Sequence, residues 1–187
     1  RTKFLWKGTL YERLRVKNFA SETRRLRFNY LFDADFHDLF EVRGVGRQAR
    51  GRVSARVIGP DRVEFHYFGL DGISRRTFIS FAPSPGVLET NGAQLDLDLA
   101  PGGAASIFVT VACGEEKVGG RVGAPQNVPD FFRAYRDSRR SRRGLTSDMA
   151  TVESSSELCN EVGCRAASDV YTLVTSTEYG PYPFAGI

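Results

Sequence analysis

The chain has 187 residues, of which 41% are hydrophobic and 26% charged, a composition typical of a globular protein that can bury a core. No apolar run approaches the roughly 20 residues of a membrane span, so we expect no transmembrane helix. The first residues, RTKFLWKGTL, lack the apolar run of a signal peptide. They also lack an initiator methionine, so we expect the chain to come from within a longer protein.

The formal net charge of +4 comes from one segment. Six arginines and one aspartate lie between Arg133 and Arg143, so this segment carries +5 and the remainder −1. A charge run is usually a solvated face, which is the interpretation we favour. The alternatives are binding of an anionic partner, such as nucleic acid phosphates, or pairing with acidic residues of another domain.

Alternation of apolar and polar residues predicts β-strands along the first part of the chain. The pattern covers 10–18, 25–32, 52–57, 63–67, 95–99 and 107–111. Turn-forming residues separate these runs, and Asn91-Gly92 predicts a tight hairpin. Short strands at this spacing predict an antiparallel β-sandwich or barrel between Phe4 and Cys113.

The character of the chain changes after Cys113. A glycine-rich linker is expected over 114–125, followed by a helix that Asn127 caps and that ends near Gly144. A second helix is expected to begin near Ser147 or Asp148, because apolar residues recur at three- and four-residue steps up to Val174. The tail EYGPYPFAGI contains two prolines, so we expect neither helix nor strand there.

The stretch from Phe32 to Gly44, FDADFHDLFEVRG, places four carboxylates and a histidine within thirteen residues. A glycosidase opposes two carboxylates across one sugar, and such groups usually come from separate elements. A metal site would need the loop to curl, and no glycine lies inside the run to help it. These carboxylates (Asp33, Asp35, Asp38 and Glu41) therefore predict neither a catalytic pair nor a metal site.

We interpret this stretch as a single turn over 35–39 between two strands, the second at 40–43. Asp33 or Asp35 would cap the turn. Three apolar side chains, Phe36, Leu39 and Phe40, would then fill the end of the sandwich.

Other catalytic or cofactor chemistry is not indicated by the sequence. His37 and His66 have no readable relation to a cysteine, and no phosphate-cradling glycine loop or zinc spacing occurs. The three cysteines, Cys113, Cys159 and Cys164, are too sparse to predict a disulfide framework. We expect no cofactor and a reducing compartment, the cytoplasm.

Three segments resemble the amylo-α-1,6-glucosidase, or glycogen-debranching-like, family: FLWKGTLYERLRVKN, FDADFHDLFEVRG and, at the far end, GPYPFAGI. Their order and spacing match the family's domain that precedes the catalytic barrel. The resemblance implies a mainly β fold: an antiparallel β-sandwich of the supersandwich type, followed by helices that begin an (α/α)6-type barrel. It implies a sandwich domain over 1–113, a linker with a short helix over 114–147, and the start of the barrel over 148–187.

The resemblance implies a parent protein that hydrolyses α-1,6-glucosidic branches of glycogen or a related α-glucan, without membrane or nucleic-acid partners. Its catalytic acid and base would lie beyond Ile187, so no catalytic residue is assigned here. Tyr179, Tyr182 and Phe184 could form a rim of the sugar site or pack a domain junction. Two alternatives remain open: a stand-alone carbohydrate-binding module, and an anion- or nucleic-acid-binding protein that uses Arg133 to Arg143. Apolar helix faces left exposed would favour self-association.

Overall fold

The computed structural model describes residues 1–117, 131–146 and 152–184. The chain divides into two compact units, Arg1–Phe131 and Phe132–Ile187, which are described separately. The domain boundaries expected from the sequence stay a prediction. Among the described helices, none is long and apolar enough to cross a membrane.

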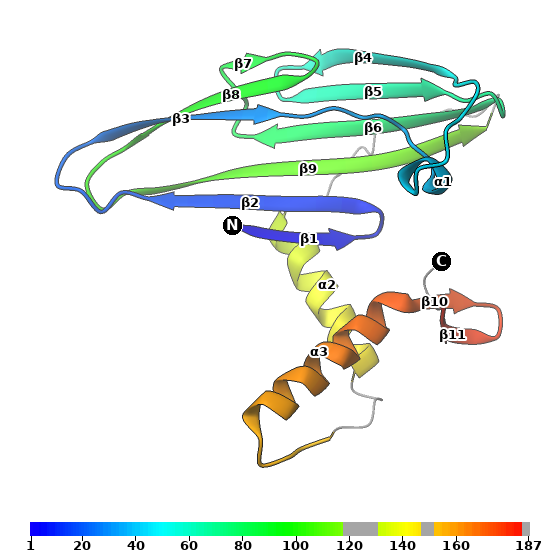
Figure 1. Cartoon of the computed structure of the whole chain (residues 1–187). Helices are drawn as coiled ribbons and strands as arrows, with labels where there is room; N and C mark the ends of the chain where they lie inside the picture. Colours follow the sequence, from blue (N-terminus) through cyan, green and yellow to red (C-terminus); the bar gives the residue numbers. More distant parts are fainter. Residues whose placement is uncertain (118–130, 147–151, 185–187) are drawn as a thin grey trace. The chain divides into compact units, whose positions relative to one another are not determined.

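The first unit contains a six-stranded sheet in which every neighbouring pair of strands is antiparallel (Figure 1). Its order is β1-β2-β9-β6-β5-β4. The strands are β1 (Thr2–Trp6), β2 (Thr9–Lys17), β4 (Arg52–Gly59), β5 (Arg62–Phe68), β6 (Ile73–Ala82) and β9 (Ala104–Lys117).

A smaller sheet has the order β3-β8-β7, with β3 (Arg24–Leu31), β7 (Val87–Leu88) and β8 (Gly92–Leu99). The hairpin expected at Asn91-Gly92 is confirmed, because β7 and β8 pair antiparallel around it. Asn18, which is 6% exposed, ties the end of β2 to the end of β8. Its side-chain amide donates to the carbonyls of Leu99 at 2.9 Å and Ala100 at 3.2 Å.

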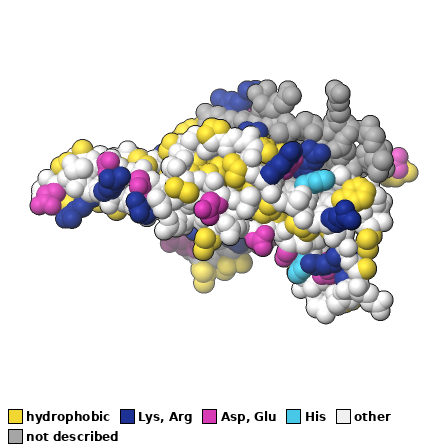
Figure 2. Space-filling model, turned by 90° about the horizontal axis from the view of Figure 1, so that it is seen from above, with side chains coloured by type: hydrophobic (Ala, Val, Ile, Leu, Met, Phe, Trp, Pro, Cys, Tyr) yellow, Lys and Arg dark blue, Asp and Glu magenta, His cyan; other side chains and the backbone are white. Residues whose placement is uncertain are grey.

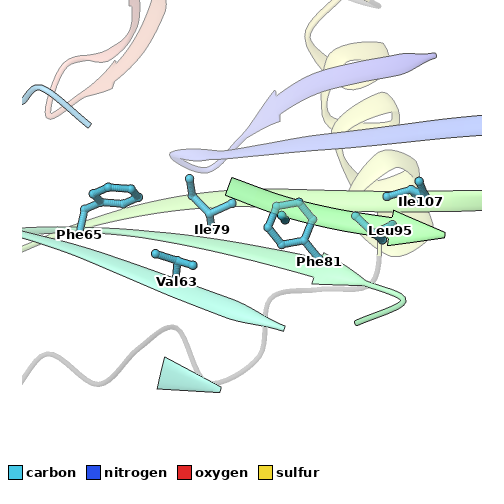
Figure 3. Packing of buried hydrophobic residues seen from close by; sticks show 7 residues of the cluster. Val63, Phe65, Ile79, Phe81, Leu95 and Ile107 are labelled. Atoms are coloured by element: carbon cyan, nitrogen blue, oxygen red, sulfur yellow. The ribbon is translucent and has the colours of Figure 1, made fainter. Parts of the chain in front are cut away.

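The hydrophobic core lies between the two sheets (Figure 3). The larger sheet contributes side chains from β5, β6 and β9, and the smaller sheet contributes Ala93 and Leu95 from β8. Each fully buried Val, Leu, Ile or Phe stabilises the fold by about 1.5–3 kcal/mol relative to exposure. The core members are Val63, Phe65, Ile79, Phe81, Ala93, Leu95 and Ile107. The predicted mainly β, antiparallel sandwich is confirmed.

The edge strand β4 departs from the expected burial. Val53 and Val57 alternate with arginines, yet they are 51% and 43% exposed. They pair with Tyr67 and Val63 of β5, which are buried. Residues 52–58 are exposed on both faces of this edge strand, so β4 adds little to the core.

The start of the expected linker is strand. β9 continues through Gly114 to Lys117, where it pairs with residues 73–76 of β6. Long strands tolerate polar residues and a glycine where a neighbouring strand supplies backbone partners. The remainder of the expected linker, and the expected cap at Asn127, lie outside the described residues.

The two expected helices are present as α2 (Phe131–Thr146), which starts at the last residue of the first unit, and α3 (Glu157–Leu173). The predicted start of the second helix near Ser147 or Asp148 is wrong. Residues 147–151 lie outside the description, and residues 152–156 are not helical. Ser156 is the N-cap, and its hydroxyl accepts the Cys159 amide hydrogen at 3.4 Å. Serine favours this position because it satisfies an otherwise free helix donor.

The prediction that the tail forms no regular structure is also wrong. β10 (Val174–Thr177) and β11 (Gly180–Pro183) form an antiparallel hairpin in the second unit. Pro181 and Pro183 are two residues apart, so both ring nitrogens point away from the partner strand, where no amide hydrogen is needed.

Candidate functional site

The stretch FDADFHDLFEVRG forms a loop after β3 and the short helix α1 (Leu39–Val42). Asp38 is the N-cap: its carboxylate accepts the Glu41 amide hydrogen at 2.9 Å. The Glu41 carboxylate accepts the Asp38 amide hydrogen at 3.0 Å, which completes a capping box. The predicted strand at 40–43 is therefore wrong.

The predicted caps act more locally than expected. Asp35 accepts the His37 amide hydrogen at 3.1 Å, and Asp33 accepts that of Ala34 at 2.7 Å. These are turn contacts of one or two residues, and neither carboxylate caps α1.

Only one of the three apolar side chains predicted to fill the sandwich end does so. Phe36 packs against the core cluster and stacks on Tyr67. Leu39 is 41% exposed and Phe40 is 65% exposed, so their placement in the core was wrong. Side chains point in different directions on a helix and on a strand, so the helix α1 leaves Leu39 and Phe40 outside the core.

A cleft of about 700 Å³ opens beside this loop, within the first unit. Its walls come from the loop before α1, the loop between α1 and β4, the end of β5, the turn that follows it, and the start of β6. The lining residues are Phe36, His37, Asp38, Arg47, Gln48, Ala49, Tyr67, Gly69, Leu70, Asp71 and Arg75. Figure 2 shows the histidine side chains toward one end of the face it presents, with basic side chains beside them, while acidic and basic side chains also occur along the rest of that face.

Charged groups at the cleft occur as ion pairs. Asp38 pairs with Arg47, and Asp71 pairs with Arg75 at 2.9 Å. Behind the lining, Glu41 pairs with Arg50 at 2.7 Å. Two arginines therefore face two aspartates in the lining, which keeps the cleft close to neutral.

The same contacts hold the carboxylates ionised. The Arg75 hydrogen bond, with help from the Ile73 amide, lowers the pKa of Asp71 from 3.8 to about 2. The pKa of Asp38 is lowered chiefly by the Glu41 backbone N–H. The pKa of Glu41 is lowered chiefly by the Asp38 backbone N–H. All three groups are therefore carboxylates at neutral pH.

An aromatic pair forms one wall. The rings of Phe36 and Tyr67 are stacked, with centroids 5.3 Å apart and planes 17° apart. Tyr67 is 5% exposed, and its hydroxyl oxygen accepts the Gly51 amide hydrogen at 3.1 Å. Phe36 is half-buried and has a φ of 50°, a region that bulky residues rarely adopt.

Gly51 and Gly69 allow the backbone to pass close to its neighbours at this site. A Cβ at Gly51 would lie 1.9 Å from the Phe68 carbonyl oxygen. A Cβ at Gly69 would lie 2.3 Å from the Asp71 carboxylate and 2.9 Å from the Arg75 guanidinium. Glycine at both positions therefore preserves the shape of the cleft.

Sequence reasoning missed most of the cleft. Tyr67 lies in the strand predicted over 63–67, and Asp71 lies in the turn that follows it, so neither residue indicates a site by its local pattern. The segment RGVGRQARG, residues 43–51, does give a sequence signal for the cleft, because arginines and glycines are concentrated in a loop between two regular elements.

The metal and cysteine patterns can be checked in the described part of the chain. There, no group of three histidine, cysteine, aspartate or glutamate side chains could hold a metal ion. Cys113, Cys159 and Cys164 are free and exposed.

The predicted sugar-site residues lie in the second unit. Tyr179 is 93% exposed and lies in the turn between β10 and β11, whereas Tyr182 on β11 is 58% exposed. Phe184 is 51% exposed, and its ring packs edge-on against that of Tyr182 at 5.0 Å. A role in sugar binding stays a prediction for all three.

The arginine cluster lies on α2. All six of its arginines are exposed, as expected of a solvated face. Whether the cluster has a partner stays a prediction. The six are Arg133, Arg136, Arg139, Arg140, Arg142 and Arg143.

The first unit is thus an antiparallel β-sandwich domain with a polar and aromatic cleft beside its connecting loops. Residues 1–110 match the family described as the N-terminal domain of (some) glycogen debranching enzymes. The chain belongs to this family, which confirms the resemblance seen in its sequence.

A solved structure described as "Putative kojibiose phosphorylase from human microbiome" is also similar, with 11% sequence identity and a TM-score of 0.42. The similarity covers 89% of this chain and 20% of that one, so this chain spans about a fifth of its length. Among the curated proteins, no sequence matches this chain.

Proposed function

We propose that this chain supplies a non-catalytic β-sandwich domain to a glycoside hydrolase that acts on α-1,6-glucosidic branches of glycogen or a related α-glucan. The observation that supports this most is the family match over residues 1–110. The parent's catalytic acid and base would then lie in residues beyond Ile187.

The state of the cleft carboxylates supports a non-catalytic role for the sandwich. Glycoside hydrolysis needs one carboxylic acid that is still protonated near neutral pH, which requires a raised pKa. Hydrogen bonds and arginines lower the pKa of Asp38, Glu41 and Asp71 instead. None of these three could donate the proton that the leaving sugar oxygen needs.

In the second unit, the exposed rings of Tyr179, Tyr182 and Phe184 are proposed to form part of the parent's sugar-site rim. A sugar ring offers apolar C–H faces, and aromatic side chains supply flat apolar area for them. Tyr182 on β11 and Phe184, the residue after this strand, are held in a fixed relation because their rings pack on each other.

The test compares the 187-residue chain with the complete protein that its gene encodes. Each is incubated with a phosphorylase limit dextrin, and released glucose is measured. We expect release by the complete protein and none by the 187-residue chain. Glucose release by the 187-residue chain would show that the catalytic carboxylates lie within it. No release by the complete protein would contradict the proposed debranching activity.

A further inference from the structure

We infer that the cleft beside α1 is a binding site for a neutral oligosaccharide, a short segment of α-glucan. Only the choice of an α-glucan rests on the proposed function. The site itself stands on the size of the cleft, its balanced charges and its aromatic wall.

The size of the cleft suits a ligand of a few sugar rings. Sites for small molecules typically enclose about 300–1,000 Å³, and this cleft measures about 700 Å³. It lies wholly in the first unit, so its shape is set by one compact body.

The charges favour a neutral ligand with many hydroxyl groups. An anion that approached Arg47 or Arg75 would also meet Asp38 and Asp71, with which these arginines pair. A sugar hydroxyl both donates and accepts, so it can bond to a guanidinium and a carboxylate at once. Carboxylate oxygens accept strongly, and their lowered pKa values keep them in the accepting form.

Two side chains in the lining are suited to further polar contacts. Gln48 is exposed and offers an amide donor and a carbonyl acceptor. The Arg47 side chain is 41% exposed, and its contact with Asp38 uses one of three guanidinium nitrogens.

The aromatic wall supplies the apolar contact that a sugar face needs. Tyr67 covers one face of the Phe36 ring. Phe36 is only half-buried, so part of its side chain stays accessible. Phe36 also borders a second hollow of about 280 Å³, which Cys113 lines as well. Its positive φ places a large ring at a position that most residues would avoid, a kind of strain that clusters at ligand sites.

Binding is measured with the 187-residue chain by titration calorimetry with maltoheptaose and by retardation in gels containing glycogen. Inorganic phosphate is the anionic probe. Phe36→Ala and Gln48→Ala remove lining groups, whereas Phe40→Ala removes an exposed ring that does not line the cleft. Thermal melting checks that each variant is folded.

We expect maltoheptaose to bind the unaltered chain and Phe40→Ala equally. Phe36→Ala should weaken binding about tenfold or more, because an aromatic side chain that contacts the ligand often carries much of the affinity. Gln48→Ala should weaken it by about threefold. Gln48 is exposed, so its replacement keeps the test valid if Phe36→Ala does not fold.

The two histidines provide a readout that needs no variant. His37 lines the cleft, whereas His66 lies outside it on β5. In an NMR titration, maltoheptaose should shift the ring signals of His37 and leave those of His66 in place.

Three results would overturn the inference: no saccharide binding, binding that the Phe36 and Gln48 variants both retain, or binding of phosphate in preference to maltoheptaose. Each leaves the proposed function standing, because that depends on glucose release from a limit dextrin by the complete protein. Conversely, if the complete protein released no glucose, saccharide binding by the 187-residue chain would still support the inferred binding site.

Discussion

Asp38 and Glu41 cap each other's backbone, with each carboxylate accepting the other residue's amide hydrogen, at 2.9 and 3.0 Å. Each also binds an arginine of the following loop: Asp38 binds Arg47 and Glu41 binds Arg50. The carboxylates of this acidic stretch thus hold the loops that form one wall of the cleft.

Asp38→Ala should lower the melting temperature by a few degrees, because it removes the N-cap and the contact with Arg47 together. Asp98→Ala is the matched control, since Asp98 has only an exposed ion pair with Arg25 at 3.7 Å. Differential scanning calorimetry compares the two. Equal melting temperatures would show that the capping box does not hold the loop.

The sequence predicted the sandwich because strand alternation is a local pattern. The alternation pattern did not predict β1 and β6, because apolar and polar residues do not alternate regularly in these two strands. In β1, Phe4, Leu5 and Trp6 are consecutive apolar residues. In β6, Phe78 is buried on the face opposite Ile79 and Phe81. A strand that buries side chains on both faces loses its period-two signal.

The cleft could not be predicted in the same way. Phe36 and Asp38 lie some 30 residues before Tyr67 and Asp71, and the pairing of β4 with β5 and of β5 with β6 brings the two segments together. A pattern within either segment cannot show that the two segments lie close together in the fold. For α3, by contrast, the sequence holds the signal for its start: the serines at 154–156 favour a helix cap over a helix interior.

Gly51→Ala should destabilise the fold by about 1–3 kcal/mol, because the added methyl group would overlap the Phe68 carbonyl and push the chain away from β5. The hydrogen bond from Gly51 to the Tyr67 hydroxyl would be lost with it. Gly46→Ala is the control, since nothing lies within 4 Å of its Cβ position. Urea unfolding measures both. A Gly51→Ala variant as stable as Gly46→Ala would contradict the close approach.

Asp71 should make stability depend on pH between about 4 and 2. Its folded pKa of about 2 lies below its ordinary 3.8, so the unfolded chain takes up the proton first as pH falls. The stability that ionised Asp71 contributes is fully present above its ordinary pKa, and it is lost as the pH falls through its folded pKa. Asp71→Asn should remove this part of the pH dependence in thermal melts, and an NMR titration should give the folded pKa directly. An unchanged pH profile in Asp71→Asn would contradict the pairing with Arg75.

Glu64 joins Arg56 and Arg76 across three strands, on the face of the larger sheet opposite the core. It is 3% exposed, and Arg76 approaches it at 3.2 Å. Glu64→Gln keeps its size and removes its charge, which should cost about 1–3 kcal/mol. The exposed Asp98→Asn should change little by comparison. If urea unfolding finds the two variants alike, the buried carboxylate does not stabilise the sheet.

Tyr182 tests the proposed sugar rim in the complete protein. Tyr182→Ala should lower kcat/KM for a limit dextrin about tenfold if its ring contacts sugar in the transition state. Phe19→Ala is the control, because Phe19 is also an exposed aromatic ring, 85% exposed, and it lies in the first unit. A ring that only packs a domain junction would lower the melting temperature and leave kcat/KM close to that of the unaltered protein. Loss of activity at an unchanged melting temperature supports contact with sugar, because the ring then acts on the substrate and not on the fold.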